Sequence, residues 1–165
     1  MGLDISTLYS RMKSNSELYY TIRRAYGKNY FDASIKAKTA FLELINDLDI
    51  KPYDYEKAFF ICTALALQDS PYGEKTISTY LAEIYNNGTT SKSQKRDIRK
   101  LLATDLDDTG KLLHQLSTIM KKPLKEKVLN LNYLYEDLDN WNNEISSPRL
   151  RWAKTIVNNR KREEK

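Results

Sequence analysis

Glycine and proline are scarce in this chain, and apolar residues recur at intervals of three and four along most of it. The 165 residues include only 5 Gly and 4 Pro, the two residues that most often interrupt regular structure. Apolar recurrence at this spacing indicates amphipathic helices. The sequence therefore predicts an all-α fold of about nine helices. The predicted ranges are 4–13, 16–27, 33–48, 54–68, 76–86, 92–104, 108–121, 131–142 and 148–161. Asp54, Asp107 and Asn130 stand at or just before the start of the fourth, seventh and eighth of these ranges and are predicted to cap them.

The most apolar stretch, residues 58–67, has a composition that also suits a buried strand. Its length with the flanking residues, and the lack of a partner strand, favour a buried helix. The stretch is too short to span a bilayer, which takes about 20 residues. It contains the only cysteine, Cys62, which we interpret as an inert buried thiol. The N-terminus lacks the apolar run of a signal peptide, so a soluble cytoplasmic protein is expected, with no membrane partner.

A break at residues 86–91 (NNGTTS) divides the chain. Gly88 stands where a C-terminal helix cap belongs. Charge also changes there: residues 1–90 carry 10 Lys+Arg and 11 Asp+Glu, a net −1, whereas residues 91–165 carry 17 and 11, a net +6. We predict two small helical bundles, residues 1–88 and a basic subdomain at 92–165, joined by a short linker. A basic half most often indicates a nucleic-acid partner, with an anionic membrane or an acidic protein as alternatives.

Basic residues gather in three places that are candidates for contact with nucleic acid. The helix predicted at 92–104 has an apolar stripe of Ile98, Leu101 and Leu102, with cations on the adjoining and opposite arc. The closing helix begins at Pro148, which suits a first turn, and Trp152, Ala153, Ile156 and Val157 share one side of it. The candidate binding residues are Arg23, Arg24, Lys28, Lys92, Lys95, Arg96, Arg99, Lys100, Arg149, Arg151 and Lys154. Both tryptophans, Trp141 and Trp152, are predicted to lie in the core.

Catalysis finds little support in the sequence, and no enzyme, metal or cofactor is predicted. The only histidine, His114, lies among leucines and is interpreted as a surface or packed residue. The acidic turn at 105–108 suits helix capping better than metal binding, which needs several ligands in a set pattern. The acidic residues at 136–139 are interpreted as a solvated helix face. Tyrosines at 19, 20, 26 and 30 are expected at the edge of the core rather than stacked on bases.

Taken in order, four stretches of the chain resemble the CasB family, the small subunit of the type I-E CRISPR surveillance complex called Cascade. They are similar to the family's double-arginine helix, its arginine-bearing helix with a short acidic turn, its Leu-x-x-Asp-Leu-x-x-Trp helix and its closing Arg-x-x-Trp-Ala helix. Order, spacing and total length agree over nearly the whole chain. The stretches are 22–25 (IRRA), 95–105 (KRDIRKLLATD), 131–141 (LNYLYEDLDNW) and 149–154 (RLRWAK).

This resemblance implies a non-catalytic, all-helical subunit. In the family, two copies sit head to tail along the complex, brace other Cascade subunits, and help to hold the guide RNA–target DNA hybrid and the displaced DNA strand. Base pairing reads the sequence in such systems, and the protein contacts backbone and shape. Two alternatives stay open: a protein-interaction adaptor without nucleic-acid contact, and a free helix-turn-helix DNA-binding regulator using helices 76–86 and 92–104.

Overall fold

The computed structural model describes residues 3–105, 108–143 and 147–163, and these ranges contain nine α-helices and no β-strand. The predicted all-α fold is confirmed, and each helix overlaps its predicted range. Two short 3-10 turns, Tyr30–Asp32 and Pro52–Asp54, precede α3 and α4. The helices are α1 (Ile5–Lys13), α2 (Ser16–Arg24), α3 (Ile35–Leu44), α4 (Tyr55–Gln68), α5 (Ile77–Asn86), α6 (Lys92–Ala103), α7 (Thr109–Lys125), α8 (Leu134–Asp139) and α9 (Pro148–Glu163).

Short polar side chains set the start of five of these helices. In each case a side-chain oxygen accepts a hydrogen bond from the backbone N–H three residues later, which satisfies a donor that the first turn would otherwise leave free. The capping residues are Asp4, Asn15, Ser34, Thr76 and Ser91. Pro148 is the first residue of α9, as predicted.

Other predicted caps are not borne out. Asp54 precedes α4 but makes no capping bond. Asn130 stands four residues before α8 and instead accepts from the Asn132 N–H at 3.0 Å. Asp107 lies outside the described residues. Gly88 is not a left-handed cap, because Asn87, the residue after α5, has extended backbone (φ −77°, ψ 123°) and the positive φ among described glycines belongs to Gly27.

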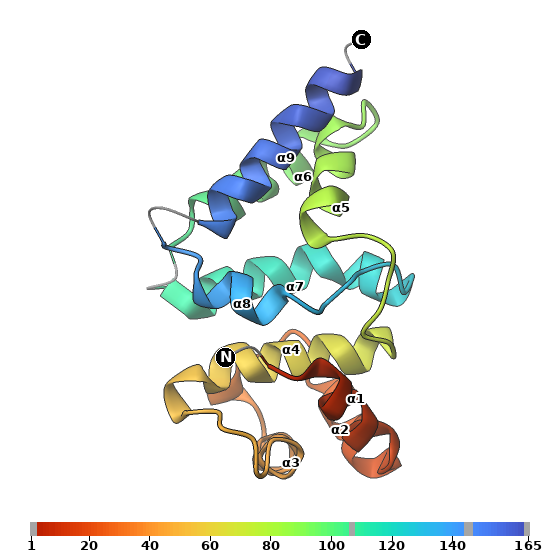
Figure 1. Cartoon of the computed structure of the whole chain (residues 1–165), viewed down its shortest axis with the longest axis vertical. Coiled ribbons are helices and arrows are strands. Elements are labelled where there is room, and N and C mark those ends of the chain that lie inside the picture. The colour runs from red at the N-terminus through yellow and green to blue at the C-terminus, as the bar shows by residue number, and fades with distance from the viewer. Residues whose placement is uncertain (1–2, 106–107, 144–146, 164–165) are drawn as a thin grey trace.

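Helix α4 is the central element of the fold. Residues 57–66 are buried on every side, which explains a continuous apolar run with no polar stripe. Helices α1, α2 and α3 lie on one side of α4, and α7 and α8 lie on the other (Figure 1). The choice of helix over strand for this segment is confirmed, and Cys62 is buried as predicted.

A backbone pairing joins residues 71–75, which follow α4, to residues 128–131, which follow α7. The Gly73 N–H donates to the Leu129 carbonyl at 2.9 Å, and the Lys75 N–H donates to the Val128 carbonyl at 2.8 Å. The buried Gln68 amide extends this pairing, because it accepts from the Leu129 N–H at 3.0 Å and donates to the Leu129 carbonyl at 2.8 Å. We refer to these two paired segments, residues 71–75 and 128–131, as the strap.

Replacing Gly73 by alanine is expected to weaken this strap. A Cβ atom at Gly73 would overlap the backbone of Val128 and Leu129, so one segment must move away and lengthen the pairing hydrogen bonds. We expect a loss of about 1–3 kcal/mol in the free energy of unfolding, measured by urea denaturation. Gly88→Ala is the control, since nothing lies within 4 Å of its Cβ position. Equal stability of the two variants would contradict the expectation.

Helix α5 packs mainly against α9, although it precedes the predicted boundary at residue 88. The Asn86 side chain donates to the Ile156 carbonyl at 3.0 Å, and α6 packs beside both helices. Helices α5, α6 and α9 therefore form the upper part of the molecule (Figure 1). The division into bundles at 1–88 and 92–165 stays a prediction, and this packing groups α5 with the second bundle.

Trp141 and Trp152 are both buried, as predicted, and their rings pack edge to face with centroids 5.0 Å apart. The Trp141 indole N–H donates to the Thr104 carbonyl at 2.8 Å. This pair joins the end of α6, the end of α8 and the first turns of α9. The predicted apolar side of α9 is wrong for Val157, which is 51% exposed, because α5 covers only the stripe that contains Trp152 and Ile156.

Candidate nucleic-acid interface

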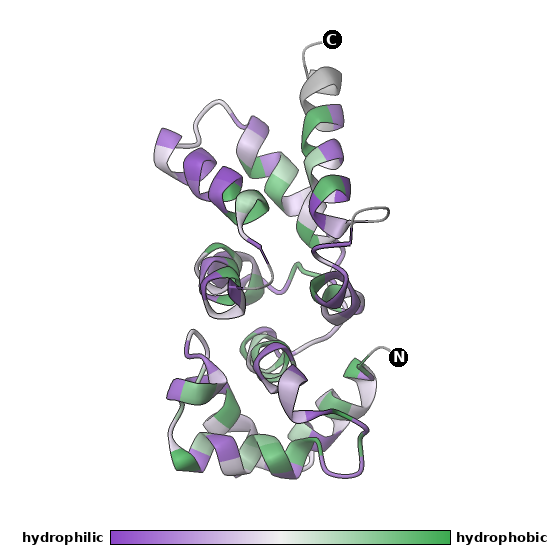
Figure 2. Cartoon of the chain, turned by 90° about the vertical axis from the view of Figure 1, so that its left-hand side faces the viewer, coloured by the Kyte–Doolittle hydropathy of each residue, from purple (hydrophilic) through white to green (hydrophobic). Residues whose placement is uncertain are grey.

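Helix α6 separates a buried stripe from a charged outer face. Ile98 and Leu101 are buried and Leu102 is half-buried, so the predicted apolar stripe is confirmed. This stripe packs against α5, α7 and α9. The opposite face is strongly hydrophilic and points outward at the upper left of Figure 2. The helix is thus anchored on one side and open to a partner on the other.

The five cations of α6 all lie on its outer face. At 100° per residue they fall within an arc of about 140°. Within the described part of the chain, none of them forms an ion pair. Like charges this close on a helix repel one another, and a polyanion would remove that cost. The residues are Lys92, Arg96, Arg99 and Lys100, which are exposed, and Lys95, which is half-buried.

The outer face of α6 meets α7 at a shallow depression of about 610 Å³. Lys100 from α6 and Lys111 and Gln115 from α7 line it. The Thr104 hydroxyl donates to the Gln115 side chain at 2.9 Å and fixes the junction. Two carboxylates, Asp105 and Asp108, also line the depression. Cations from two helices therefore share one surface.

The basic face of α7 was not predicted from the sequence. Residues 112, 113, 116, 117, 120, 123 and 124 are buried, and they occupy one side of the helix. The exposed side carries four lysines, with His114 and Thr118 between the first and second of them. Intervals of three (Lys122 to Lys125), four (Lys121 to Lys125) and eleven (Lys111 to Lys122) keep these lysines on one helical face, and this spacing was the available signal. The lysines are Lys111, Lys121, Lys122 and Lys125.

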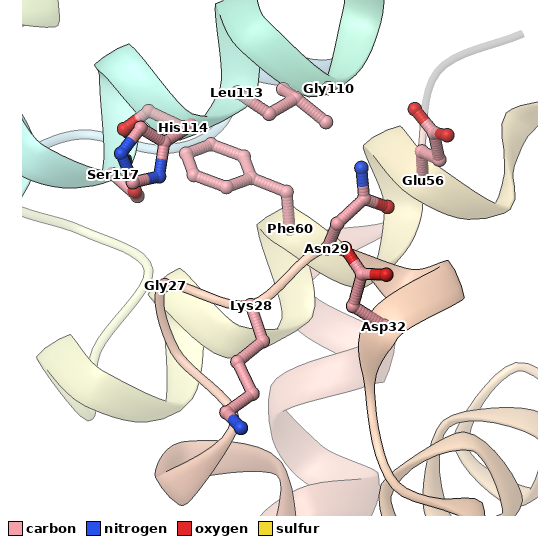
Figure 3. Close-up of a pocket in the computed structure, with 10 residues that line it drawn as sticks. All are labelled: Gly27, Lys28, Asn29, Asp32, Glu56, Phe60, Gly110, Leu113, His114 and Ser117. Atoms are coloured by element: carbon pink, nitrogen blue, oxygen red, sulfur yellow. Dashed lines mark hydrogen bonds between the residues drawn. The ribbon is translucent and has the colours of Figure 1, made fainter.

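The α2 cluster lies apart from this surface. Arg23, Arg24 and Lys28 are all exposed, and Lys28 lines a pocket of about 470 Å³ that residues of α7 also line. Two carboxylates, Asp32 and Glu56, line that pocket, and the Lys28 side chain points away from α7 (Figure 3). The α2 cations and the α6 cations are not brought together.

The same pocket holds polar groups but no activated nucleophile. Ser117 and His114 both line it (Figure 3). The Ser117 hydroxyl donates to the His114 backbone carbonyl at 2.7 Å rather than to the imidazole. Nucleophilic catalysis needs the hydroxyl bonded to the base itself. Burial raises the pKa of Glu56, although a hydrogen bond from Asn29 opposes this shift.

Arg149 is committed to contacts within the protein. Its Nη2 donates to the Thr104 carbonyl at 3.0 Å, to Asp105 Oδ1 at 2.8 Å and to Asn142 Oδ1 at 2.9 Å. Its guanidinium also lies over the Trp141 ring, 5.8 Å from the centroid. These contacts close the junction between α6 and α9, so Arg149 has a clear structural role.

Arg151 and Lys154 lie on the exposed side of α9. Helix α9 lies at the front of Figure 1 and at the right of Figure 2, away from the outer face of α6. Arg151 Nη2 lies 2.6 Å from Asp137 Oδ1, and no described residue pairs with Lys154. The α9 cations therefore form a surface separate from α6.

The interpretation of the acidic residues of α8 as a solvated face is correct for Glu136 and Asp139, which are exposed, and wrong for Asp137, which is half-buried. Asp137 pairs with Arg151, and Asp139 pairs with Lys57 of α4 at 2.6 Å. Glu136 has no ion-pair partner among the described residues. These pairs join α8 to α9 and to α4.

Three of the four tyrosines near α2 belong to the core edge, as interpreted. The Tyr19 hydroxyl donates to the Ala66 carbonyl at 3.0 Å, and the Tyr26 hydroxyl donates to the Ser117 carbonyl at 2.7 Å. Tyr30 packs edge to face on Phe41. Tyr20 is 49% exposed.

Searches against protein-family models, curated proteins and solved structures found no match for this chain. Among the residues that the structure describes, no group of three or more His, Cys, Asp or Glu is placed to hold a metal ion. Within the same ranges, every helix is too short or too polar to cross a lipid bilayer. Function is therefore inferred from the geometry of the basic surfaces.

Proposed function

We propose that this protein binds the sugar–phosphate backbone of nucleic acid through α6 and acts as a non-catalytic subunit of an RNA-guided complex of the Cascade type. The observation that carries the proposal is the outer face of α6. Five cations share one arc of a helix whose other side is anchored in the core. Such a face offers phosphates several charge-assisted contacts at once.

The chemistry of this face suits backbone contact rather than base reading. Phosphate contacts position a protein without carrying sequence information. Helix α6 presents lysines and arginines in series, whereas base reading uses a few side chains directed at base edges. In an assembly with several copies or subunits, a high effective concentration raises occupancy although one isolated copy binds weakly.

The place of this chain in a Cascade-type complex rests on the resemblance to the CasB family. Three of the four stretches that carry the resemblance meet in one core. Trp141, Trp152 and Thr104 come from separate stretches and are in direct contact. Under this proposal the partners are the guide RNA, the target and displaced DNA strands, other Cascade subunits and a second copy of the chain.

The proposal is tested by the salt dependence of single-stranded DNA binding to the purified chain. If five phosphates are neutralised, log K falls with log salt with a slope near −3.5. Arg96→Gln combined with Arg99→Gln is expected to reduce that slope to about −2. The control, Lys36→Gln with Lys51→Gln, removes the same charge from exposed sites on α3 and before α4. An unchanged slope in the Arg96/Arg99 variant would contradict backbone binding through α6.

Co-purification from the native host tests the assembly. We expect a tagged chain to carry a guide RNA and several unlike subunits, in about two copies per complex. Protein partners without any nucleic acid would favour the adaptor alternative. A sequence-specific footprint without RNA would favour the helix-turn-helix alternative, although the five residues between α5 and α6, 87–91, exceed the usual turn of 3–4.

A further inference from the structure

We infer that the exposed face of α7 is a second tract for the same single strand, so that a strand held by α6 continues along α7. This inference rests on the proposed function and specifies the path and the form of the nucleic acid. The α7 face is defined by Lys111, Lys121, Lys122 and Lys125. From the first to the last of these residues the helix rises about 21 Å.

The lysines of the α7 face are open to a ligand. All four are exposed, and none forms an ion pair with a residue that the structure describes. His114, Gln115 and Thr118 fill the space between Lys111 and Lys121. No carboxylate lies within α7 itself, since Asp108 precedes the helix and Glu126 follows it. The face is a linear stripe of positive charge with polar groups between, which matches a linear polyanion.

The helix dipole explains only part of this stripe. Lys122 and Lys125 lie in the last turn, where the negative end of the helix dipole favours cations. Lys111 lies in the first turn, at the positive end of the dipole, where the same effect disfavours a cation. Binding of an external anion therefore accounts better than helix stabilisation for lysines along the whole length of α7.

The α7 face is continuous with α6. Lys100 and Lys111 line the same depression, and Figure 2 shows α6 directly above α7 on the same side of the molecule. Of the two carboxylates there, Asp105 is held by Arg149 at 2.8 Å, and Asp108 is exposed. Among the residues that the structure describes, only Asp108 of these two carboxylates has no ion-pair partner.

The angle between the helices favours a single strand over a duplex. In Figure 2, α7 is seen end-on whereas α6 is seen from the side, so the axes diverge strongly. A duplex is stiff over about 150 base pairs and cannot follow both axes over a few nanometres. A flexible single strand can, and positively charged grooves that track one strand are the usual mode for such binding.

The test compares the charge variants of the two helices with the same control. Lys121→Gln with Lys122→Gln is expected to reduce the salt slope for a single strand of about 20 nucleotides by about 1.4. The wild-type protein is expected to bind an oligonucleotide of about 20 nucleotides more tightly than one of about 6 nucleotides. This difference in affinity is expected to be smaller in the variant. Lys36→Gln with Lys51→Gln should leave both quantities unchanged. Far-UV circular dichroism verifies that each variant keeps its helices.

Each remaining outcome separates the two proposals. If the Lys121/Lys122 variant behaves as wild type while the Arg96/Arg99 variant weakens binding, the α7 tract is wrong and the proposed function stands. If neither variant changes binding, the proposed function fails as well. Equal affinity for a duplex of the same length would overturn the single-strand path. Displacement by polyglutamate at equal charge concentration would identify an acidic polypeptide as the partner and overturn the inference.

Discussion

Trp141→Ala is expected to lower the free energy of unfolding by about 3–5 kcal/mol, the range for truncating a large buried aromatic residue. Trp141 is fully buried against Trp152. Its removal also leaves the Thr104 carbonyl without the indole donor 2.8 Å away and removes the ring beneath the Arg149 guanidinium. The variant thus loses packing and polar contacts at the junction of α6, α8 and α9.

Urea denaturation followed by far-UV circular dichroism measures this loss. Trp141→Phe is the matched control, because it keeps an aromatic ring but removes the indole N–H, and we expect it to lose less than half as much stability. A loss below about 1 kcal/mol for Trp141→Ala would contradict a core role. Since Thr104 follows α6 directly, the alanine variant should also weaken DNA binding more than Trp141→Phe does.

Removing both acidic partners of Lys57 is expected to cost about 3 kcal/mol, because it leaves a buried ammonium group unpaired. Lys57 Nζ lies 2.9 Å from Asp54 Oδ1 and 2.6 Å from Asp139 Oδ1, and only 10% of its side chain is exposed. Burial lowers the pKa of Lys57, but the hydrogen bonds to these two carboxylates outweigh it and the pKa is raised above 10.5. The stabilisation is therefore present below pH 10.5 and is lost as pH rises through the folded pKa.

A charge-rescue series tests this assignment by urea denaturation at pH 7. Asp54→Asn with Asp139→Asn should lose stability, and addition of Lys57→Met should recover most of it, because an apolar side chain in place of a buried charge is often neutral. Asp49→Asn is the control, since its partner Lys51 is exposed and such pairs contribute little. Failure of Lys57→Met to recover any stability would show that the carboxylates act in some other way.

Helix positions could be predicted from the sequence because their causes are local. Apolar spacing sets the buried stripe of α6, and Ser91 sets its first turn. Where the prediction failed, tertiary packing prevailed: α7 continues to residue 125 through Pro123 because Pro123 and Leu124 are buried in the core. The predicted caps at Asn130 and Gly88 failed because other contacts determine the backbone there.

The candidate site could be predicted only in part. Charge pattern alone identified the α6 cations, since a helix anchored by Ile98 and Leu101 must turn Arg96 and Arg99 outward. It did not distinguish Arg149, whose donors are used within the protein, from Lys154, which is exposed on α9. The two differ through partners 44 and 45 residues away along the chain, which periodicity does not reveal.

The sequence by itself determined that this protein is all-helical, that its tryptophans are buried and that its positive charge gathers in the second half. These properties follow from the order of residue types along one helix or one segment. Only the tertiary structure decided which cations share a surface. It places Lys100 beside Lys111, sets α2 and α9 apart from the outer face of α6 (Figures 1 and 2), and pairs Lys57 of α4 with Asp139 of α8. The physical reason is that a shared surface depends on how helices pack, and helix packing depends on side chains that are distant in sequence.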